Sequence, residues 1–203
     1  MAVIRYAGRE DAAGIIEIYA PYVRDTAVSF EEDVPSQDEY GRRINKIGVS
    51  HPFLVCESGG RIAAYAYASS FRVRAAYRFS AELSIYVAAA RQGAGLGKIL
   101  YSCLLDLLRK QGFYTAFGVI TLPNPASIAL HESLGFVSAG VWRKAGHKLN
   151  AWHDLALVQK ELLKPDDLSS PVEPLPAAEV RSRFDADFFA PYAARLNAIR
   201  SPT

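Results

Sequence analysis

The sequence predicts a three-layer α/β domain, in which helices cover both faces of one mixed sheet. The chain has 203 residues and half of them are hydrophobic, so its length suits one domain with a proper core. Apolar residues follow the period of a strand in some segments and of a helix in others. These segments come in the order strand, two helices, three strands, helix, strand, helix and two strands. That mixed order predicts a single sheet with helices packed against it.

The first half of the chain holds two predicted helices. Apolar residues recur at helical spacing within residues 10–23, and Pro21 indicates that this helix stops or kinks near its end. Ser36 and Glu39 form a capping-box pair that opens a second helix, which runs to about Ile47. The predicted strands of this half are residues 2–7, 53–57, 61–69 and 81–87, the middle two joined as a hairpin.

The second half continues the alternation of strands and helices. A stripe of leucines predicts a helix from about Leu96 to Gln111, which Gly112 ends. A strand at residues 115–122 and a short helix at residues 124–134 follow. The last two predicted strands are residues 136–143 and 152–160, joined by a loop around Gly146.

The composition changes at residue 164. Four prolines predict an extended linker, namely Pro165, Pro171, Pro174 and Pro176. The aromatic residues beyond them predict one or two short amphipathic helices, which dock either on the domain or on a partner subunit. We therefore divide the chain into a domain at residues 1–163 and a linker with a C-terminal extension at residues 164–203.

Charge and cysteine content exclude several classes of protein. The formal net charge is only +2, so a basic nucleic-acid-binding surface is not indicated. Cys56 and Cys103 lie in apolar surroundings without metal-ligand spacing, which argues against a disulfide scaffold or a metal site and fits a reducing compartment. Neither a signal peptide nor a membrane-spanning apolar stretch is visible, so we expect a cytoplasmic protein with no nucleic-acid or membrane partner.

The segment RQGAGLGK at residues 91–98 is the most informative part of the sequence. Its glycines let backbone N–H groups approach a ligand, and the helix that follows adds unpaired donors, so the segment suits a pyrophosphate. A dinucleotide fingerprint would require glycine where Lys98 stands, and a Walker loop fails at Gln92 and Ile99. The alternative is a glycine-rich strand-to-helix turn without a ligand.

Two signatures resemble those of the GNAT superfamily of N-acetyltransferases. Gln92, Gly95 and Gly97 match the coenzyme A pyrophosphate pattern Q/R-x-x-G-x-G/A. A second signature, asparagine followed by a short helix and a closing Gly-Phe, is met by Asn124, Ala126, Ser127, His131, Glu132, Gly135 and Phe136. The segments TAVSFEEDVP, TLPNPASIALHESLGF and AGHKLNAWHD are similar to the phosphinothricin acetyltransferase branch, which also includes methionine sulfoximine and methionine sulfone acetyltransferases. The resemblance covers about residues 2–163 and implies the acyl-CoA N-acyltransferase fold, whose mixed central sheet is mostly antiparallel.

The resemblance implies that acetyl-coenzyme A is the co-substrate. The strand before the glycine segment is then expected to separate from the next strand, and the pantetheine arm to pair there with the main chain of Ile85, Tyr86 and Val87. Backbone amides are expected to hold the pyrophosphate, from Gln92, Gly93, Ala94, Gly95, Leu96, Gly97 and Lys98. Asn124 and Ser127 are expected near the pantetheine, although Asn124 is also well placed to cap its helix.

Acetyl transfer to an amine requires a neutral nucleophile, so a base near the site helps to remove a proton. Glu82 matches the branch's catalytic glutamate, and the alternative is a buried ion pair with Arg72 or Arg74. His131 stands where many members carry the tyrosine that protonates the coenzyme A sulfur, and the alternative is a structural histidine. Sequence alone leaves open which of the two is the base.

Residues on two loops are the candidate acceptor-binding groups. Arg72, Arg74 and Tyr77 precede the Glu82 strand, and guanidinium groups suit carboxylate, phosphinate or sulfonyl oxygens. The alternative is a solvated basic loop. Phe30 and Glu31 are expected to form the opposite wall. Three residues of the branch's C-terminal pattern are interpreted as packing or interface residues and not as metal ligands, namely His147, Trp152 and His153.

The resulting hypothesis is acetyl transfer from acetyl-CoA to the amino group of a small amino-acid-like substrate, such as phosphinothricin or methionine sulfoximine. Acetylation of a protein or peptide N-terminus is the second interpretation, and a coenzyme A-binding regulator without catalysis is the third. Relatives in the superfamily commonly pair, so we also expect a homodimer.

Overall fold

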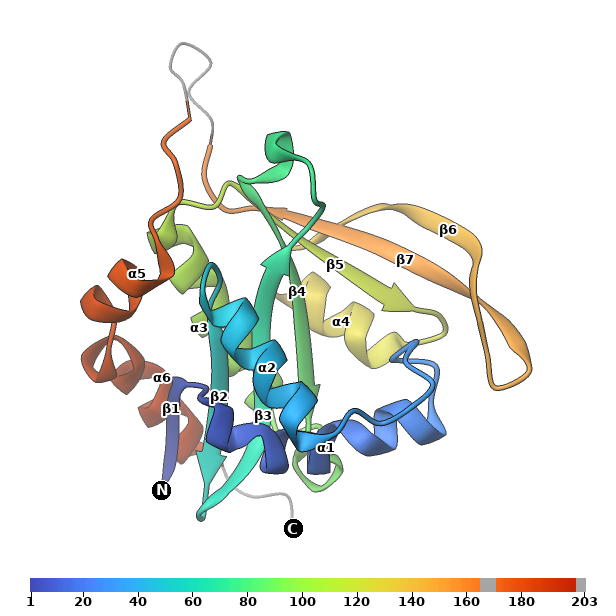
Figure 1. Cartoon of the computed structure of the whole chain (residues 1–203), viewed down its shortest axis with the longest axis horizontal. Coiled ribbons are helices and arrows are strands. Elements are labelled where there is room, and N and C mark those ends of the chain that lie inside the picture. The colour runs from blue at the N-terminus through green and yellow to red at the C-terminus, as the bar shows by residue number, and fades with distance from the viewer. Residues whose placement is uncertain (165–170, 200–203) are drawn as a thin grey trace.

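A seven-stranded sheet forms the centre of the molecule (Figure 1). The computed structural model describes residues 1–164 and 171–199. The strands lie in the order β1-β2-β3-β4-β5-β7-β6, and all neighbours are antiparallel except β4 and β5. Their bounds are β1 Ala2–Tyr6, β2 Phe53–Ser58, β3 Arg61–Ser70, β4 Ser80–Val87, β5 Thr115–Thr121, β6 Val137–Lys148 and β7 Ala151–Glu161. The prediction of a mixed, mostly antiparallel sheet is confirmed.

Helices cover both faces of this sheet, which confirms the three-layer prediction. On one face lie α1 (Ala12–Asp25) and α2 (Gln37–Gly48), and on the other lie α3 (Leu96–Gln111) and α4 (Pro125–Ser133) (Figure 1). Each face has its own apolar core. The buried side chains under α1 and α2 include Ile15, Ile44 and Phe53, and those under α3 include Leu100, Leu104 and Leu108.

The helix ends follow local signals in the sequence. The Ser36 hydroxyl accepts a hydrogen bond from the Glu39 amide at 3.2 Å and so caps α2. Gly112 has a φ of 101° and ends α3 in the left-handed conformation. Helix α1 continues beyond Pro21 and ends at Asp25, one turn further on.

The hairpin of β6 and β7 differs from its prediction. Strand β6 does not end at Arg143 but continues through Gly146 to Lys148, so the predicted loop around Gly146 is wrong. The register shifts between Trp142 and Gly146, and within that irregular stretch Lys144 has a positive φ. The turn itself is formed by the next two residues after the strand, which both have positive φ, Leu149 and Asn150.

The sheet forks between β4 and β5. These parallel strands pair only from Ser80 to Glu82 on β4 and from Thr115 to Phe117 on β5. Beyond that point β4 stays paired with β3, and β5 stays paired with β7. The main-chain groups that face each other across the fork are therefore not used by the sheet, as predicted for the strand before the glycine segment.

The C-terminal extension contains two helices, α5 (Ala177–Arg183) and α6 (Ala186–Ala198). Val180, Phe189 and Leu196 are buried in the same apolar core as α3. Helix α6 packs against β1 and α3 of its own chain (Figure 1). Of the prolines that predicted a linker, Pro165 lies outside the described residues.

Candidate active site

The fork between β4 and β5 encloses a small cavity of about 60 Å³. Both strands contribute to its walls, together with α3 and α4, and the lining residues include Ser84, Ile85, Tyr86, Tyr101, Val119, Thr121, Asn124, Ser127 and His131. The closed end of the fork is the last register pair, Glu82 with Phe117. The open end lies at the carboxyl end of β4, where the chain enters the glycine segment. A ligand that enters at the glycine segment is thus directed along β4 toward Glu82.

The glycine segment forms an anion cradle at the start of α3. Gly93 and Gly95 have φ values of 76° and 81°, which favour glycine at both positions. Gly95 is the N-cap of α3 and offers no side chain to the first-turn amides, so these donors remain available to a ligand. The donors and the positive end of the helix dipole therefore fit the pyrophosphate of coenzyme A.

A cleft of about 670 Å³ runs from this cradle to α4. It is lined by most of the residues that the sequence nominated for coenzyme A, namely Ile85, Val87, Gln92, Gly93, Gly95, Leu96, Gly97, Lys98, Asn124 and Ser127. Ala94 is not among the lining residues, and Tyr86 lines the smaller cavity in the fork. The Tyr22 hydroxyl donates to the Val87 carbonyl at 2.8 Å and Gln92 Nε2 donates to it at 3.4 Å, so this carbonyl already has two partners.

Asn124 has the capping role that the sequence allowed. Its Oδ1 accepts a hydrogen bond from the Ser127 amide at 3.1 Å, at the first turn of α4. Because both residues also line the cleft of about 670 Å³, the cap is compatible with the predicted contact with coenzyme A.

Glu82 lies at the closed end of the fork and is partly buried. Burial raises the pKa of its carboxyl group, and the nearby Arg72 guanidinium opposes that rise. Among the described residues no ion pair joins Glu82 to Arg72 or Arg74, so the buried ion pair considered as an alternative is not formed. A carboxyl group with a raised pKa at the end of a cleft is suited to accept a proton.

His131 lies on α4 and is only 3% exposed. Its Nδ1 is 2.8 Å from the Ser127 carbonyl, so Nδ1–H is the donor and Nε2 carries the lone pair in the neutral ring. Burial lowers the pKa of His131, and the hydrogen bond to the Ser127 carbonyl opposes that change. The imidazole is therefore neutral near pH 7 and accepts a hydrogen bond at Nε2.

Tyr101 was not singled out in the sequence. It lies in the leucine stripe of α3, where its ring reads as one more core residue, and no sequence signal marks its hydroxyl. In the structure that hydroxyl is 3.4 Å from His131 Nε2, and Tyr101 lines the cavity in the fork. Burial raises the pKa of Tyr101 well above its ordinary value, so the hydroxyl keeps its proton.

Glu82 and His131 approach the fork from opposite faces of the sheet. Leu83 packs in the core under α3, so its neighbour Glu82 points to the face covered by α1 and α2. On the α3 side, a Cβ at Gly118 would lie 2.9 Å from His131 Nε2, so the imidazole packs directly against β5 at this position. Since Gly118 follows Phe117, the partner of Glu82, both groups flank the closed end of the fork.

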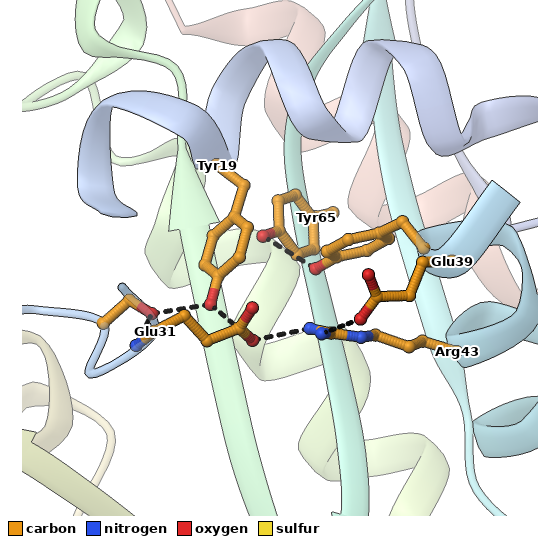
Figure 2. Close-up of polar contacts among 7 residues, drawn as sticks. Tyr19, Glu31, Glu39, Arg43 and Tyr65 are labelled. Atoms are coloured by element: carbon orange, nitrogen blue, oxygen red, sulfur yellow. Dashed lines mark hydrogen bonds and ion pairs between the residues drawn. The ribbon is translucent and has the colours of Figure 1, made fainter. Parts of the chain in front are cut away.

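The predicted acceptor wall around Phe30 and Glu31 lies in the loop between α1 and α2. The Glu31 carboxylate accepts from the Tyr19 hydroxyl at 3.1 Å and from Arg43 at 2.5 Å, as Figure 2 shows. Phe30 packs so closely on β6 that a Cβ at Gly146 would lie 2.1 Å from its ring. Glu31 is therefore tied into a polar network, whereas Phe30 is held by the hairpin of β6 and β7.

Lys148 also holds this loop and was missed by sequence reasoning. Its side chain is buried at the end of β6, and Nζ donates to the carbonyls of Val23 and Ser29, both at 2.6 Å. Burial lowers the pKa of the ammonium, and Glu32 and Glu31 oppose that change. A lysine directly before a turn gives no local sequence signal for such a role.

The predicted arginine loop lies beyond the closed end of the fork. Arg72, Arg74 and Tyr77 line an open cavity of about 550 Å³ that also contacts the C-terminal extension. The Arg72 guanidinium lies over the Trp142 ring of β6 at 5.8 Å. Both predicted walls thus contact β6, one at Trp142 and the other at Gly146.

Within residues 1–164 and 171–199, no helix has the length and apolar character needed to cross a membrane. In the same described residues, no group of three His, Cys, Asp or Glu side chains is arranged to hold a metal ion.

A forked sheet with an uncapped glycine-rich helix start at its open end defines an acyltransferase of the GNAT class. A family model described as "Acetyltransferase (GNAT) domain" matches residues 4–157, so the chain belongs to this family. It is therefore an acetyl-CoA-dependent N-acetyltransferase, and the resemblance inferred from the two signatures is confirmed.

Individual relatives belong to the same branch. The phosphinothricin N-acetyltransferase of Streptomyces viridochromogenes is 35% identical over 162 residues, which cover 80% of this chain and 88% of that protein. The L-methionine sulfoximine/L-methionine sulfone acetyltransferase of Salmonella typhimurium is 35% identical over 164 residues, with 78% and 94% covered. A crystal structure of a phosphinothricin acetyltransferase from Sinorhizobium meliloti in complex with AcCoA superposes with a TM-score of 0.80 at 38% identity, with 86% and 95% covered.

Proposed function

We propose that the protein transfers the acetyl group of acetyl-CoA to the α-amino group of a small amino-acid-like acceptor. Phosphinothricin and methionine sulfoximine are the candidate acceptors, because relatives at 35% identity carry those names. The observation that carries the proposal is the fork, which has an anion cradle at its open end and Glu82 beside its closed end. Val87 lies five residues after Glu82 on β4, about 17 Å of extended strand, which suits an extended pantetheine arm.

Glu82 is proposed as the group that takes the proton from the acceptor ammonium. It points to the face on which the loop of Phe30 and Glu31 lies, whereas His131 lies on the other face. Once the amine is neutral, its lone pair forms a bond with the thioester carbonyl carbon, and the bond between that carbon and sulfur breaks. Tyr101 and His131, on the α3 side, are proposed to supply a proton to the departing sulfur, since the Tyr101 hydroxyl keeps its proton beside His131 Nε2.

The arginine loop is proposed to bind the second polar head of the acceptor. A guanidinium group pairs with carboxylate, phosphinate or sulfonyl oxygens through two parallel hydrogen bonds. Arg72 is the best placed of the predicted residues, because it acts electrostatically on Glu82 and lies over Trp142.

The test is the release of free coenzyme A from acetyl-CoA, followed with a thiol reagent. L-phosphinothricin, L-methionine sulfoximine and a short peptide with a free N-terminus are supplied separately. Turnover with either small amine and not with the peptide supports the proposal. Turnover with the peptide alone would favour the alternative of N-terminal acetylation, and binding of coenzyme A with no turnover on any amine would favour a regulator.

We also propose a homodimer that uses the hairpin of β6 and β7. Strand β6 is an outer strand of the sheet, and large apolar side chains of the hairpin are exposed, namely Val137, Val141, Trp142, Leu149 and Trp152. Trp152 is 63% exposed, so Trp152→Glu is expected to give a folded monomer. Sedimentation velocity measures the mass, and a wild-type chain that sediments as a monomer at micromolar concentration removes this proposal.

Cytoplasmic residence is proposed on two grounds. Cys56 and Cys103 are both free and buried, which suits a reducing compartment. The use of acetyl-CoA as co-substrate is the second ground for a cytoplasmic location. Fractionation of cells that express the chain at native levels measures this directly.

A further inference from the structure

The C-terminal extension follows α3 from one end of the helix to the other. At the carboxyl end, the Leu175 amide donates to the Gln111 carbonyl at 2.7 Å, and Gln111 Nε2 donates back to the Leu175 carbonyl at 2.9 Å. Along the helix, the Tyr192 hydroxyl donates to Asp106 at 2.6 Å. These contacts fix the extension to the helix whose amino end forms the anion cradle.

The extension is anchored in the core at the same time. Val180 and Phe189 are 1% and 3% exposed and belong to the apolar core under α3. The Asn197 side chain binds the backbone of the edge strand β1, because it accepts from the Ala2 amide at 2.6 Å and donates to the Ala2 carbonyl at 3.1 Å. The extension therefore has a defined position from which it can hold other parts of the molecule.

Each end of the extension reaches one of the two ligand-binding loops. At its start, Glu173 forms a two-pronged ion pair with Arg78, in which Arg78 Nε is 2.9 Å from both carboxylate oxygens. Arg78 belongs to the arginine loop at residues 71–79. At the other end, Ile199 Cδ1 lies 3.7 Å from the position of a Cβ at Gly95, so its side chain lies beside the Gly95 N-cap of the anion cradle.

We propose that residues 171–199 form a strap that positions both ligand-binding loops. Glu173 positions the acceptor loop through Arg78, and Ile199 positions the cofactor cradle through Gly95. Neither residue is proposed to bind a ligand itself, so both are positioning residues. The family match ends at residue 157, so the strap is an addition to the acetyltransferase domain. The acceptor part of this inference rests on the proposed function, whereas the cofactor part rests on coenzyme A binding alone.

The experiment compares two variants, each of which is expected to change a different binding constant. Glu173→Gln is expected to raise the KM for the acceptor about two- to fivefold, the range of an exposed ion pair, with kcat and the Kd for coenzyme A unchanged. Ile199→Ala is expected to raise the Kd for coenzyme A roughly three- to tenfold, with little change in the acceptor KM at saturating acetyl-CoA. The double variant Arg78→Glu with Glu173→Arg restores the ion pair and is expected to recover the acceptor KM.

The control is Val172→Ala, since Val172 is 74% exposed beside the Glu173 anchor and is expected to change neither constant. If Glu173→Gln and Ile199→Ala alter both constants alike, or lower only the melting temperature, the extension is merely structural and the inference is wrong. If wild-type protein turns over no amine, the proposed function fails. Calorimetry of Ile199→Ala with coenzyme A alone then still decides the cofactor part.

Discussion

Replacement of Lys148 by methionine is expected to destabilise the protein and to loosen the predicted acceptor wall. The change keeps the length of the side chain but removes two hydrogen bonds of 2.6 Å from a buried ammonium to the Val23 and Ser29 carbonyls. Hydrogen bonds of charged groups contribute about 1.5–3 kcal/mol each. The lowered pKa of Lys148 shows that burial of the charge offsets part of this. We therefore expect a net loss of about 3 kcal/mol in the free energy of unfolding.

For a chain of 203 residues, that loss corresponds to a fall in melting temperature of about 6–12 °C. Thermal and urea unfolding measure it, and Lys110→Met on the exposed surface of α3 is the matched control, expected within about 0.5 kcal/mol of wild type. Because Ser29 precedes Phe30 and Glu31, the KM for the acceptor is also expected to rise, with the Kd for coenzyme A unchanged. A variant that melts within 2 °C of wild type (on the scale of roughly 2–4 °C per kcal/mol) would refute this account of the loop.

Three further predictions concern the fork and the cradle. Glu82→Gln is expected to lower kcat about 10²- to 10⁴-fold. Because burial raises the pKa of Glu82, wild-type kcat/KM is expected to fall as the pH drops through a value above 4.5. A pH profile without this acidic limb contradicts the role of Glu82 as the base. The same variant is expected to lose no stability at neutral pH, because a raised pKa means that the ionised carboxyl group disfavours the fold. Gly118→Ala forces a methyl to 2.9 Å from His131 Nε2 and is expected to cost about 1–3 kcal/mol and to reduce kcat, as measured by unfolding and turnover. Gly95→Ala places a side chain at a φ of 81° and is expected to weaken coenzyme A binding in calorimetry by about tenfold, from roughly 1–2 kcal/mol of strain.

Most of the fold could be predicted, because its signals are local. The glycine pair at residues 59–60, the cap at Ser36 and the leucine stripe of α3 each depend on neighbours a few residues away, and each prediction agrees with the structure. The end of β6 could not be predicted in this way. Gly146 is typical of a turn, yet it lies within β6, where it pairs with His153. Glycine is needed there because the Phe30 ring leaves no room for a side chain. That contact joins segments more than a hundred residues apart and leaves no trace in the local pattern.

The site residues also differ in whether a local sequence pattern marks them. Gln92, Gly95 and Asn124 stand in motifs with fixed spacing, and they line the cleft that the motifs imply. Tyr101 lies in no motif, and Lys148 lies in the segment AGHKLNAWHD without a feature that sets it apart. Leucines around a tyrosine and a turn beside a lysine are ordinary surroundings for those residues. Their roles arise from what faces them across the structure, His131 in one case and the Ser29 carbonyl in the other. Such residues become visible only through burial and hydrogen bonding.

The environments of Glu82 and His131 also narrow the question that the sequence left open. Burial raises the pKa of the carboxyl group and lowers that of the imidazole, so each shift favours the uncharged form of its group and the shifts alone do not select the base. The two groups differ in position, because Glu82 points to the face of the proposed acceptor loops and His131 lies on the face covered by α3. A base must reach the nitrogen that attacks, and a proton for sulfur must come from the side on which a hydroxyl keeps its hydrogen. In the proposed mechanism the fork therefore keeps the two proton transfers apart, with Glu82 on the side of the acceptor nitrogen and Tyr101 beside His131 on the side of the sulfur.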